Sequence, residues 1–319
     1  EGRLVALAVD EAHCISAWGH DFRPDYRRLG LIRRLCPGVP MLALSATAAP
    51  RVRADIIRLL DLRSPLVQVS SARRDNLQYA MRRRPRDPMP LVLEALEQGR
   101  GATLIYARTR RSVERWAERL RELDVPATPY HAGLEPEARR DALTLFLEHE
   151  RPVLVATVAF GMGVDRADVG LVLHLDLPST PEGYLQESGR AGRDGQPAFC
   201  LVLFSPGDRT SLGWAMQAAS RGSASLEDSH RLDLAQQQLR RMEAVAEGEM
   251  GREQALLRAV GELVEPCGRC DRCTAHAKRR DWSSQAHTLL PHLEERNGMD
   301  IRRLGEPLEL MEPGRSARW

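Results

Sequence analysis

Two acidic residues, Asp10 and Glu11, follow directly on an unbroken apolar run over residues 4–9. A run of this length and composition predicts a strand that is buried on both faces of a parallel sheet. Ligands of open α/β sheets bind beyond the carboxyl ends of the strands, where these acids lie. There Asp10 can hold Mg²⁺ beside the phosphates of a nucleotide, and Glu11 can orient an attacking water. A pair of acids that caps a helix after a core strand is the alternative, and these residues alone leave it open.

Two arginines, Arg190 and Arg193, form a second group that can do chemistry. They stand three residues apart between glycines, so their two guanidinium forks can be aimed at one anion. The alternative interpretation is an arginine–aspartate turn on the surface, and the flanking glycines make this interpretation less favoured. In the segment 157–165, which follows another apolar run, two glycines allow close approach of the backbone to a ligand or unusual dihedral angles, and this signal is weaker.

Three of the six cysteines form a cluster at Cys267, Cys270 and Cys273, with the two-residue spacing of a thiolate metal site. The other three cysteines are scattered along the chain, at Cys14, Cys36 and Cys200. This distribution is not a disulfide framework, and it fits a reducing cytosol.

The elements that must position these groups form two α/β series. The first series has predicted strands over residues 4–9, 40–44 and 67–69, and a helix that opens near Pro50 with Val52, Ile56, Leu59 and Leu60 on one face. The second has predicted strands over residues 102–107, 126–130, 152–156, 169–175 and 198–204, and helices over 112–123, 136–148 and around 184–188. Alternation of this kind predicts parallel sheets with right-handed crossovers. Two series that divide near residue 75 predict two α/β domains facing each other across a cleft.

Two further segments have unusual composition. Residues 16–23 carry aromatic and basic side chains in a loop, which can stack on unpaired bases and touch phosphates. The spacing alone favours aromatics that are half buried against the domain. Residues 71–90 carry six arginines, and we interpret the end of this stretch as an exposed segment between elements. A solvated basic surface is favoured there over a phosphate-facing patch.

The composition bounds the possible functions. Of the 319 residues, 43% are hydrophobic and 28% charged, which is typical of a soluble chain with cores for two domains. No apolar run approaches the roughly 20 residues of a membrane span. The net charge is only +2, so local clusters must carry any binding of nucleic acid. Lys278 is the single lysine, and without a Gly-Lys pair the chain has no P-loop. Because the chain does not begin with Met, we expect a piece of a longer protein that starts inside a domain.

In their order along the chain, these motifs resemble a RecQ-type DNA helicase of superfamily 2. The match consists of residues 10–13, 16–23, 45–47, 130–133, 156–165 and 186–195, and it covers roughly residues 4–273. The aromatic loop directly after the acid motif separates RecQ proteins from other DEAH-type enzymes. The resemblance implies an ATP- and Mg²⁺-dependent enzyme of DNA repair and recombination. It implies 3′-to-5′ movement on single-stranded DNA, unwinding of forked DNA, and a cytoplasmic, nucleoid-associated location.

The resemblance also implies roles for single residues. Asp10 and Glu11 resemble the Mg²⁺-linked acid and the water-orienting base. Residues of the coupling between DNA and ATP hydrolysis are implied at His13, Trp18, His20, Phe22, Arg23, Ser45, Thr47, His131 and Thr157. Nucleotide contacts are implied at Asp165, Gln186, Arg190 and Arg193, with Arg193 as the arginine finger.

The cysteine cluster departs from the family pattern. RecQ proteins hold zinc with four cysteines, and the alignment places the first of them at Gly251, so only three thiols remain. Two interpretations stay open: His276 completes a Cys₃His set, or zinc binds weakly or not at all and packing holds the subdomain. We predict zinc that is substoichiometric or easily removed by a chelator.

The predicted organisation is therefore α/β, with two RecA-like domains and a small helical cysteine-containing subdomain. Residues 1–74 are the C-terminal part of the first domain, residues 75–206 the second domain, residues 207–280 a degenerate zinc-binding subdomain, and residues 281–319 the start of a winged-helix-like segment. A function of another class also stays open, because the missing P-loop favours a catalytically silent nucleic-acid-binding or interaction module for these residues.

Overall fold

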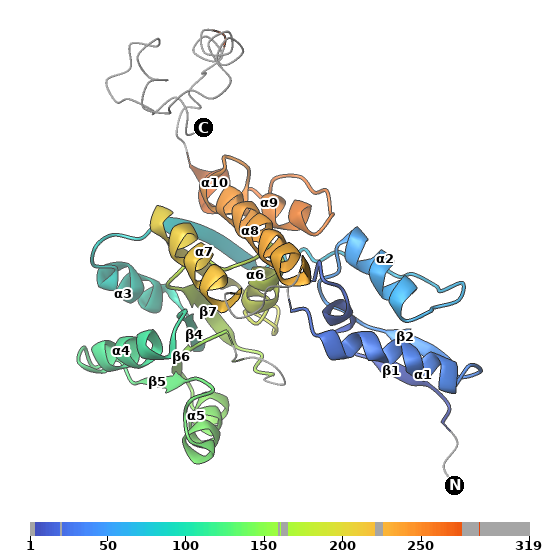
Figure 1. Cartoon of the computed structure of the whole chain (residues 1–319). Helices are drawn as coiled ribbons and strands as arrows, with labels where there is room; N and C mark the ends of the chain where they lie inside the picture. Colours follow the sequence, from blue (N-terminus) through green and yellow to red (C-terminus); the bar gives the residue numbers. More distant parts are fainter. Residues whose placement is uncertain are drawn as a thin grey trace. The chain divides into compact units, whose positions relative to one another are not determined.

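A computed structural model describes residues 4–19, 21–158, 160, 165–220, 226–275 and 287. The chain divides into two compact units, Glu1–Thr274 and Ala275–Trp319, and every helix and strand given below belongs to the first (Figure 1). The predicted winged-helix-like segment lies outside the described residues apart from His287, and so do His20 and His276. Within the described part, no helix is both long enough and apolar enough to span a bilayer.

The first α/β segment is built on a two-stranded sheet. Strand β1 (Leu7–Val9) pairs in parallel with β2 (Met41–Ala43). The remaining elements are η1 (Ala12–Ile15), η2 (Pro24–Arg28), α1 (Leu29–Leu35) and α2 (Pro50–Leu59). As predicted, α2 buries the face that carries Val52 and Ile56, which pack with Ile15 of η1 in one apolar cluster.

Two predictions for this segment are wrong. The strand expected over residues 4–9 forms only at β1, and Ala8 and Leu42 are exposed on one side of the sheet, so burial on both faces is not observed. The reason is that the apolar cluster of α2 and η1 packs with Val9 and Met41, on the other side. Residues 67–69 form no strand, and Val67 and Val69 are exposed.

The second α/β segment is a parallel six-stranded sheet in the order β3-β8-β7-β4-β6-β5. The strands are β3 (Leu77–Arg83), β4 (Ala102–Tyr106), β5 (Ala127–Tyr130), β6 (Val153–Ala156), β7 (Val169–His174) and β8 (Ala198–Phe204). The helices between them are α3 (Met89–Gln98), α4 (Arg110–Arg121), α5 (Pro136–Glu148) and α6 (Pro181–Ser188). The five predicted strands of this series are thus confirmed to within one residue at either end.

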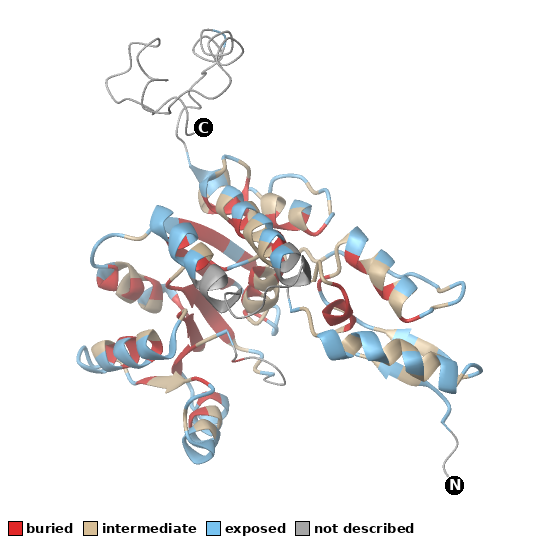
Figure 2. Cartoon of the chain, in the orientation of Figure 1, coloured by how far each residue is buried: buried red, intermediate tan, exposed pale blue. Residues whose placement is uncertain are grey.

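Helices cover both faces of this sheet, so its central strands are buried, as Figure 2 shows. One apolar cluster joins the sheet to α3 and α4, and a second joins it to α5 and α6. The second cluster also takes in side chains of α8 (Leu226–Glu247) and α9 (Arg252–Ala259). The cysteine-containing subdomain, which further includes α7 (Pro206–Ser220) and α10 (Asp271–Thr274), therefore shares the core of this sheet.

Strand β3 was not predicted, because it lies within the arginine-rich stretch 71–90, the end of which we expected to be an exposed segment. It is one of the two edge strands of the sheet, and its buried residues include Leu77, Tyr79 and Met81, while Arg82 and Arg83 are exposed. The backbone at the edge of β3 is bonded by the cysteine-containing subdomain, for example where Met81 donates its N–H to Asp271 Oδ2 at 3.0 Å. The two charged positions at its end concealed the apolar pattern.

Candidate functional site

The acid motif turns sharply at the end of β1. Glu11 adopts left-handed backbone angles (φ 48, ψ 40), and its backbone N–H donates to Asp10 Oδ1 at 2.8 Å. The next residue, Ala12, donates its N–H to the carbonyl oxygen of Leu44 at 2.8 Å, which fixes the turn to the end of β2. A left-handed non-glycine residue costs on the order of 1 kcal/mol, and such strain concentrates at functional sites. The turn thus places both acids beyond the carboxyl ends of the two strands.

His13 connects the acids to the segment after β2. It is 1% exposed, and its Nδ1 lies 3.0 Å from Ser45 Oγ and 3.3 Å from Glu11 Oε2. One imidazole therefore contacts both Glu11, the predicted water-orienting base, and Ser45, a predicted coupling residue. The neighbouring Cys14 is buried, and burial together with the nearby charge of Asp21 raises the pKa of its thiol to about 11.

The aromatic loop is folded back onto this histidine. A Cβ atom on Gly19 would lie 2.3 Å from the carbonyl oxygen of His13, so only glycine permits the approach. The guanidinium of Arg51 lies 3.1 Å from the ring centroid of Trp18. Arg27 lies 4.9 Å from that of Phe22. The loop aromatics are thus half buried under arginines, as the spacing favoured.

Arg23, the last residue of the loop, forms an ion pair of 2.5 Å with Asp21. The hydrogen bond to Asp21 raises the pKa of this guanidinium. Its backbone N–H donates to the carbonyl oxygen of Cys14 at 2.9 Å, so both ends of the loop are tied to η1.

The arginine loop, residues 189–196, follows α6. Arg193 Nη1 lies 2.5 Å from Asp165 Oδ1, in a pair whose carboxylate is 84% exposed. Gln186, on α6, donates its Nε2 to Glu11 Oε1 at 3.3 Å. Gly192 has a φ of 56, which glycine adopts without strain.

A cavity of about 970 Å³ collects residues from both α/β segments. The predicted site residues that line it are Glu11, His13, Arg23, Thr47, Asp165, Gln186, Arg190 and Arg193. Thr47 is buried. The volume falls within the range of small-molecule sites, and the predicted residues of the lining combine two carboxylates, Glu11 and Asp165, with three arginines. Such a lining can handle a phosphate anion and a water at the same time.

Other predicted residues lie outside this lining: Asp10, Trp18, Phe22, Ser45, His131 and Thr157. His131 lies at the end of β5, where its Nε2 is 3.0 Å from Glu114 Oε1 on α4. Thr157 follows β6 and donates its backbone N–H to the carbonyl oxygen of Tyr130 at 3.2 Å. Both belong to the carboxyl edge of the second sheet.

A buried group at the cavity was missed by the sequence analysis. His174 Nε2 lies 2.7 Å from Glu187 Oε2, and its ring stacks on Tyr106 at 4.8 Å between centroids. Both groups, and Tyr184 beside them, line the cavity. Burial raises the pKa of the Tyr106 and Tyr184 hydroxyls, so both stay neutral. The available signal was a histidine within the otherwise apolar run over residues 169–175.

The arginines of residues 71–90 are largely committed within the chain. Ion pairs join Arg73 to Glu253, Arg82 to Glu94, Arg83 to Glu247, and Arg84 to Asp176 and Asp208. The side chain of Arg74 donates to backbone carbonyl oxygens of the arginine loop. A phosphate-facing patch is therefore not supported for this stretch.

The three clustered thiols fit three ligand positions of a metal site. Their sulfur atoms all lie within 4.8 Å of one another, and those of Cys267 and Cys273 are 3.9 Å apart. The edge of a tetrahedral zinc site with Zn–S bonds near 2.3 Å is about 3.8 Å. A Cβ atom on Gly251 would lie 2.9 Å from Cys273 Sγ, so this glycine occupies the place of the fourth ligand and offers none. Among the described residues, the donor set is incomplete for a closed zinc site.

Comparisons with known proteins show which families the chain is similar to. The model of the family "Helicase conserved C-terminal domain" matches residues 88–195. The chain is 39% identical over 289 residues to the ATP-dependent DNA helicase RecQ of Pasteurella multocida, across 90% of this chain and 45% of that protein. It is 40% identical over 238 residues to the RecQ-like DNA helicase BLM of Xenopus laevis, across 71% of this chain and 17% of that protein. The chain therefore spans less than half the length of these relatives.

A solved structure shares the fold. The structure of S. cerevisiae Dbp5 bound to RNA and ADP BeF3 matches 74% of this chain and 63% of that chain, with a TM-score of 0.53 and 18% identity. This likeness supports the RecA-like α/β architecture.

Proposed function

Because this chain belongs to the RecQ family of superfamily 2 helicases, we propose that it forms part of an ATP-dependent 3′-to-5′ DNA helicase. The observation that carries the proposal is the shared cavity, which is lined by Glu11 from one α/β segment and by Arg190 and Arg193 from the other. Hydrolysis of ATP needs an oriented water and compensation of phosphate charge, and these residues supply both.

Each residue has a defined part in the proposed reaction. Asp10 would hold Mg²⁺, for which carboxylate oxygens are the preferred ligands, and a bound ion would supply compensation of phosphate charge. Glu11 orients the attacking water, and Gln186 positions its carboxylate through the 3.3 Å hydrogen bond. Arg190 and Arg193 stabilise the charge that develops on the transferred phosphoryl group. Closure of the two segments assembles the site, and hydrolysis releases it.

The contacts of His13 support coupling between DNA and ATP. The aromatic loop packs on the backbone of His13, and the His13 side chain contacts both Glu11 and Ser45. A base that displaces Trp18 from the guanidinium of Arg51 shifts the loop and, through it, the position of the acid motif. In this way single-stranded DNA stimulates hydrolysis.

The phosphate cradle of the proposed site is supplied elsewhere in a longer protein, since the sequence has no Gly-Lys pair. We expect negligible ATP turnover by these 319 residues and activity in a version extended upstream. The test measures DNA-stimulated ATPase and strand separation on both. Robust hydrolysis by the shorter chain would overturn the inference that these residues lack the phosphate cradle. An extended protein that neither hydrolyses ATP nor separates strands would overturn the proposed helicase function.

A second candidate function is a catalytically silent module that binds nucleic acid. The same missing cradle favours it for these residues. The extended protein discriminates the two, because a silent module binds single-stranded DNA with unchanged affinity whether or not ATP is present. For either function we propose the domain bounds predicted above and a cytoplasmic, nucleoid-associated location.

A further inference from the structure

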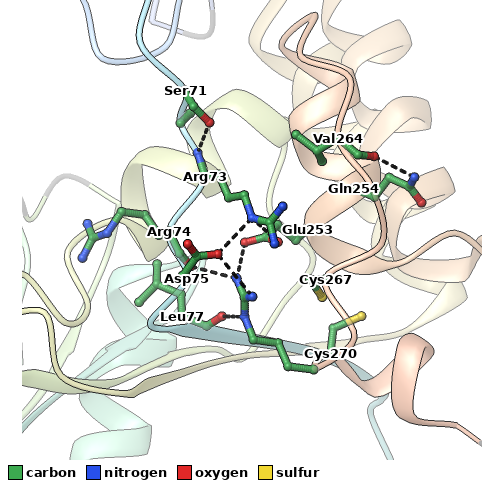
Figure 3. A network of polar contacts seen from close by, with 12 residues as sticks. Ser71, Arg73, Arg74, Asp75, Leu77, Glu253, Gln254, Val264, Cys267 and Cys270 are labelled. Carbon is green, nitrogen blue, oxygen red and sulfur yellow. Dashed lines mark hydrogen bonds and ion pairs between the residues drawn. The ribbon is translucent and has the colours of Figure 1, made fainter.

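Arg269 lies in the first two-residue step of the cysteine cluster, and its side chain reaches the segment that leads into β3. Its Nε donates to the carbonyl oxygen of Leu77 at 3.0 Å, and its Nη2 donates to that of Arg74 at 3.0 Å. The same Nη2 lies 2.6 Å from Glu253 Oε1, a carboxylate that is 3% exposed. Figure 3 shows Arg74, Leu77 and Glu253 within this network of polar contacts. The cysteine loop thus fixes the carbonyl groups at the two ends of the segment 74–77, those of Arg74 and Leu77.

The same segment holds the arginine loop on its other side. Arg74 Nη2 donates to the carbonyl oxygen of Gly192 at 2.6 Å, and Asn76 Nδ2 donates to the same oxygen at 2.7 Å. In Figure 3 the side chain of Arg74 points away from the cluster around Glu253. A Cβ atom on Gly192 would lie 2.5 Å from Asn76 Nδ2, so this contact requires the glycine. The oxygen that accepts both hydrogen bonds belongs to the peptide group that joins Gly192 to Arg193.

We propose that Arg269 is a positioning residue for Arg193 and acts through Arg74 and Asn76. The inference rests on the proposed function for the catalytic part of Arg193. The series of contacts from Arg269 through Arg74 and Asn76 to the peptide group before Arg193, here called the relay, is independent of ATP. Fixing the carbonyls of residues 74 and 77 fixes the directions of the Arg74 and Asn76 side chains. These two donors then hold the peptide from which the Arg193 side chain projects. A fixed origin lets a long side chain reach its target with less loss of conformational freedom.

Arg272 provides a matched control within the same cluster. It occupies the equivalent place in the second two-residue step, between Cys270 and Cys273. Its Nη2 donates to the carbonyl oxygen of Glu247, at the end of α8, at 3.0 Å. A substitution there perturbs the cysteine loop and its contact with α8 without removing the hydrogen bonds to Arg74 and Leu77.

Hydrogen exchange in the 319-residue chain tests the relay without ATP. The reporters are the backbone amides of Gly192 and Asp194, which donate to the carbonyl oxygens of Val169 and Ala167 at 2.8 and 3.1 Å. Arg269→Lys keeps a positive charge beside Glu253 but cannot donate to two carbonyls in the same geometry. We expect the reporter amides to exchange about tenfold faster in Arg269→Lys, and within about twofold of wild type in Arg272→Lys.

Two further variants separate positioning from general loosening. Arg74→Ala should accelerate the reporters as Arg269→Lys does, and Arg74→Lys, which retains one donor, should accelerate them less. Amides of the central strands β4 and β7 should be unchanged in all four variants. Wild-type exchange in Arg269→Lys, equal acceleration in Arg272→Lys, or acceleration across the whole sheet would each overturn the relay. Loss of ATP hydrolysis in the extended protein bears on the proposed function and leaves this result untouched.

Discussion

Gly251 stands beside Cys273 at the corner of the thiol cluster where a fourth ligand would close it. A Cβ atom on this glycine would lie 2.9 Å from Cys273 Sγ and 3.9 Å from Cys270 Sγ. The backbone of Gly251 has φ −51 and ψ 137, which any L-residue adopts. The position therefore accepts a side chain after a small movement of the Cys273 sulfur.

Gly251→Cys should convert the cluster into a closed zinc site. Structural zinc is held by four ligands, and the binding free energy of such sites is large. We expect wild-type protein to hold zinc that a chelator removes easily, and Gly251→Cys to hold one zinc per chain at least about a hundredfold more tightly. Elemental analysis after dialysis against a graded series of chelators measures this. Gly251→Ala, which adds the Cβ without the thiol, is the control, and tight stoichiometric zinc in the wild type would contradict the prediction.

Arg193→Ala should remove turnover in the extended, ATP-hydrolysing protein. The pair between Arg193 and Asp165 is exposed, so it contributes little stability and is easily exchanged for a phosphate. We expect a loss in kcat of about 10³- to 10⁵-fold, with ATP binding largely retained. Arg193→Lys should not restore the rate, because an ammonium lacks the planar fork. Arg209→Ala removes an arginine of α7 that pairs with Glu243, and it should behave as wild type.

Steady-state rates and nucleotide binding, measured on the same preparations, check this prediction. Turnover by Arg193→Ala within about tenfold of wild type would exclude a finger role, because such fingers contribute far more.

The strands of the second sheet were predictable because helices cover both of its faces. A strand such as β7 is buried along its whole length and appears in the sequence as an unbroken apolar run. The edge strand β3 has no such signature, since Gln78 interrupts its short apolar run and the strand ends in Arg82 and Arg83. For β1 a similar apolar run, residues 4–9, led to a wrong prediction of the strand's length, because residues 4–6 extend beyond the pairing with β2.

The motifs predicted which side chains from the two segments gather at the cavity, and they did not predict the tertiary contacts around them. The sequence indicated that Glu11 and the arginines would share a cleft, and all of them line one cavity. It gave no sign that Arg74 would hold Gly192, because the two residues are 118 positions apart and meet only through the pairing of β3 with β8. Contacts of this kind depend on strand order, which local composition does not specify.

Asp168→Asn should lower stability at neutral pH and lose this effect in acid. Arg166 makes two hydrogen bonds to Asp168, at 2.6 and 3.0 Å, and these hold the pKa of the carboxyl below its usual range. A lowered pKa stabilises the fold above the unfolded pKa of 3.8, and the contribution disappears as the pH falls through the folded value. The side chain is 43% exposed, so solvent screening limits the effect at neutral pH to about 0.5–1 kcal/mol.

Urea denaturation between about pH 7 and about pH 3 checks this dependence. The free energies of unfolding of wild type and Asp168→Asn should converge as the pH falls. Asp141→Asn changes an exposed aspartate on α5 and should show no comparable convergence. A difference that stays constant across the range would assign the loss to packing and not to charge.

Cys14 and Cys200 should resist alkylation in the folded protein, while Cys36 reacts. Burial raises the pKa of the Cys14 thiol to about 11 and that of Cys200 to about 12, and both side chains are 0% exposed. The thiolate is the nucleophile, so at about pH 8 these two cysteines should react with iodoacetamide at least about a hundredfold more slowly than the partly exposed Cys36. Peptide mass spectrometry over a time course gives the three rates, and the same course in concentrated urea, where all three should react alike, is the control. Fast labelling of Cys14 under native conditions would show that the loop of residues 16–23 opens away from the acid motif, contrary to the packing of Gly19 on His13.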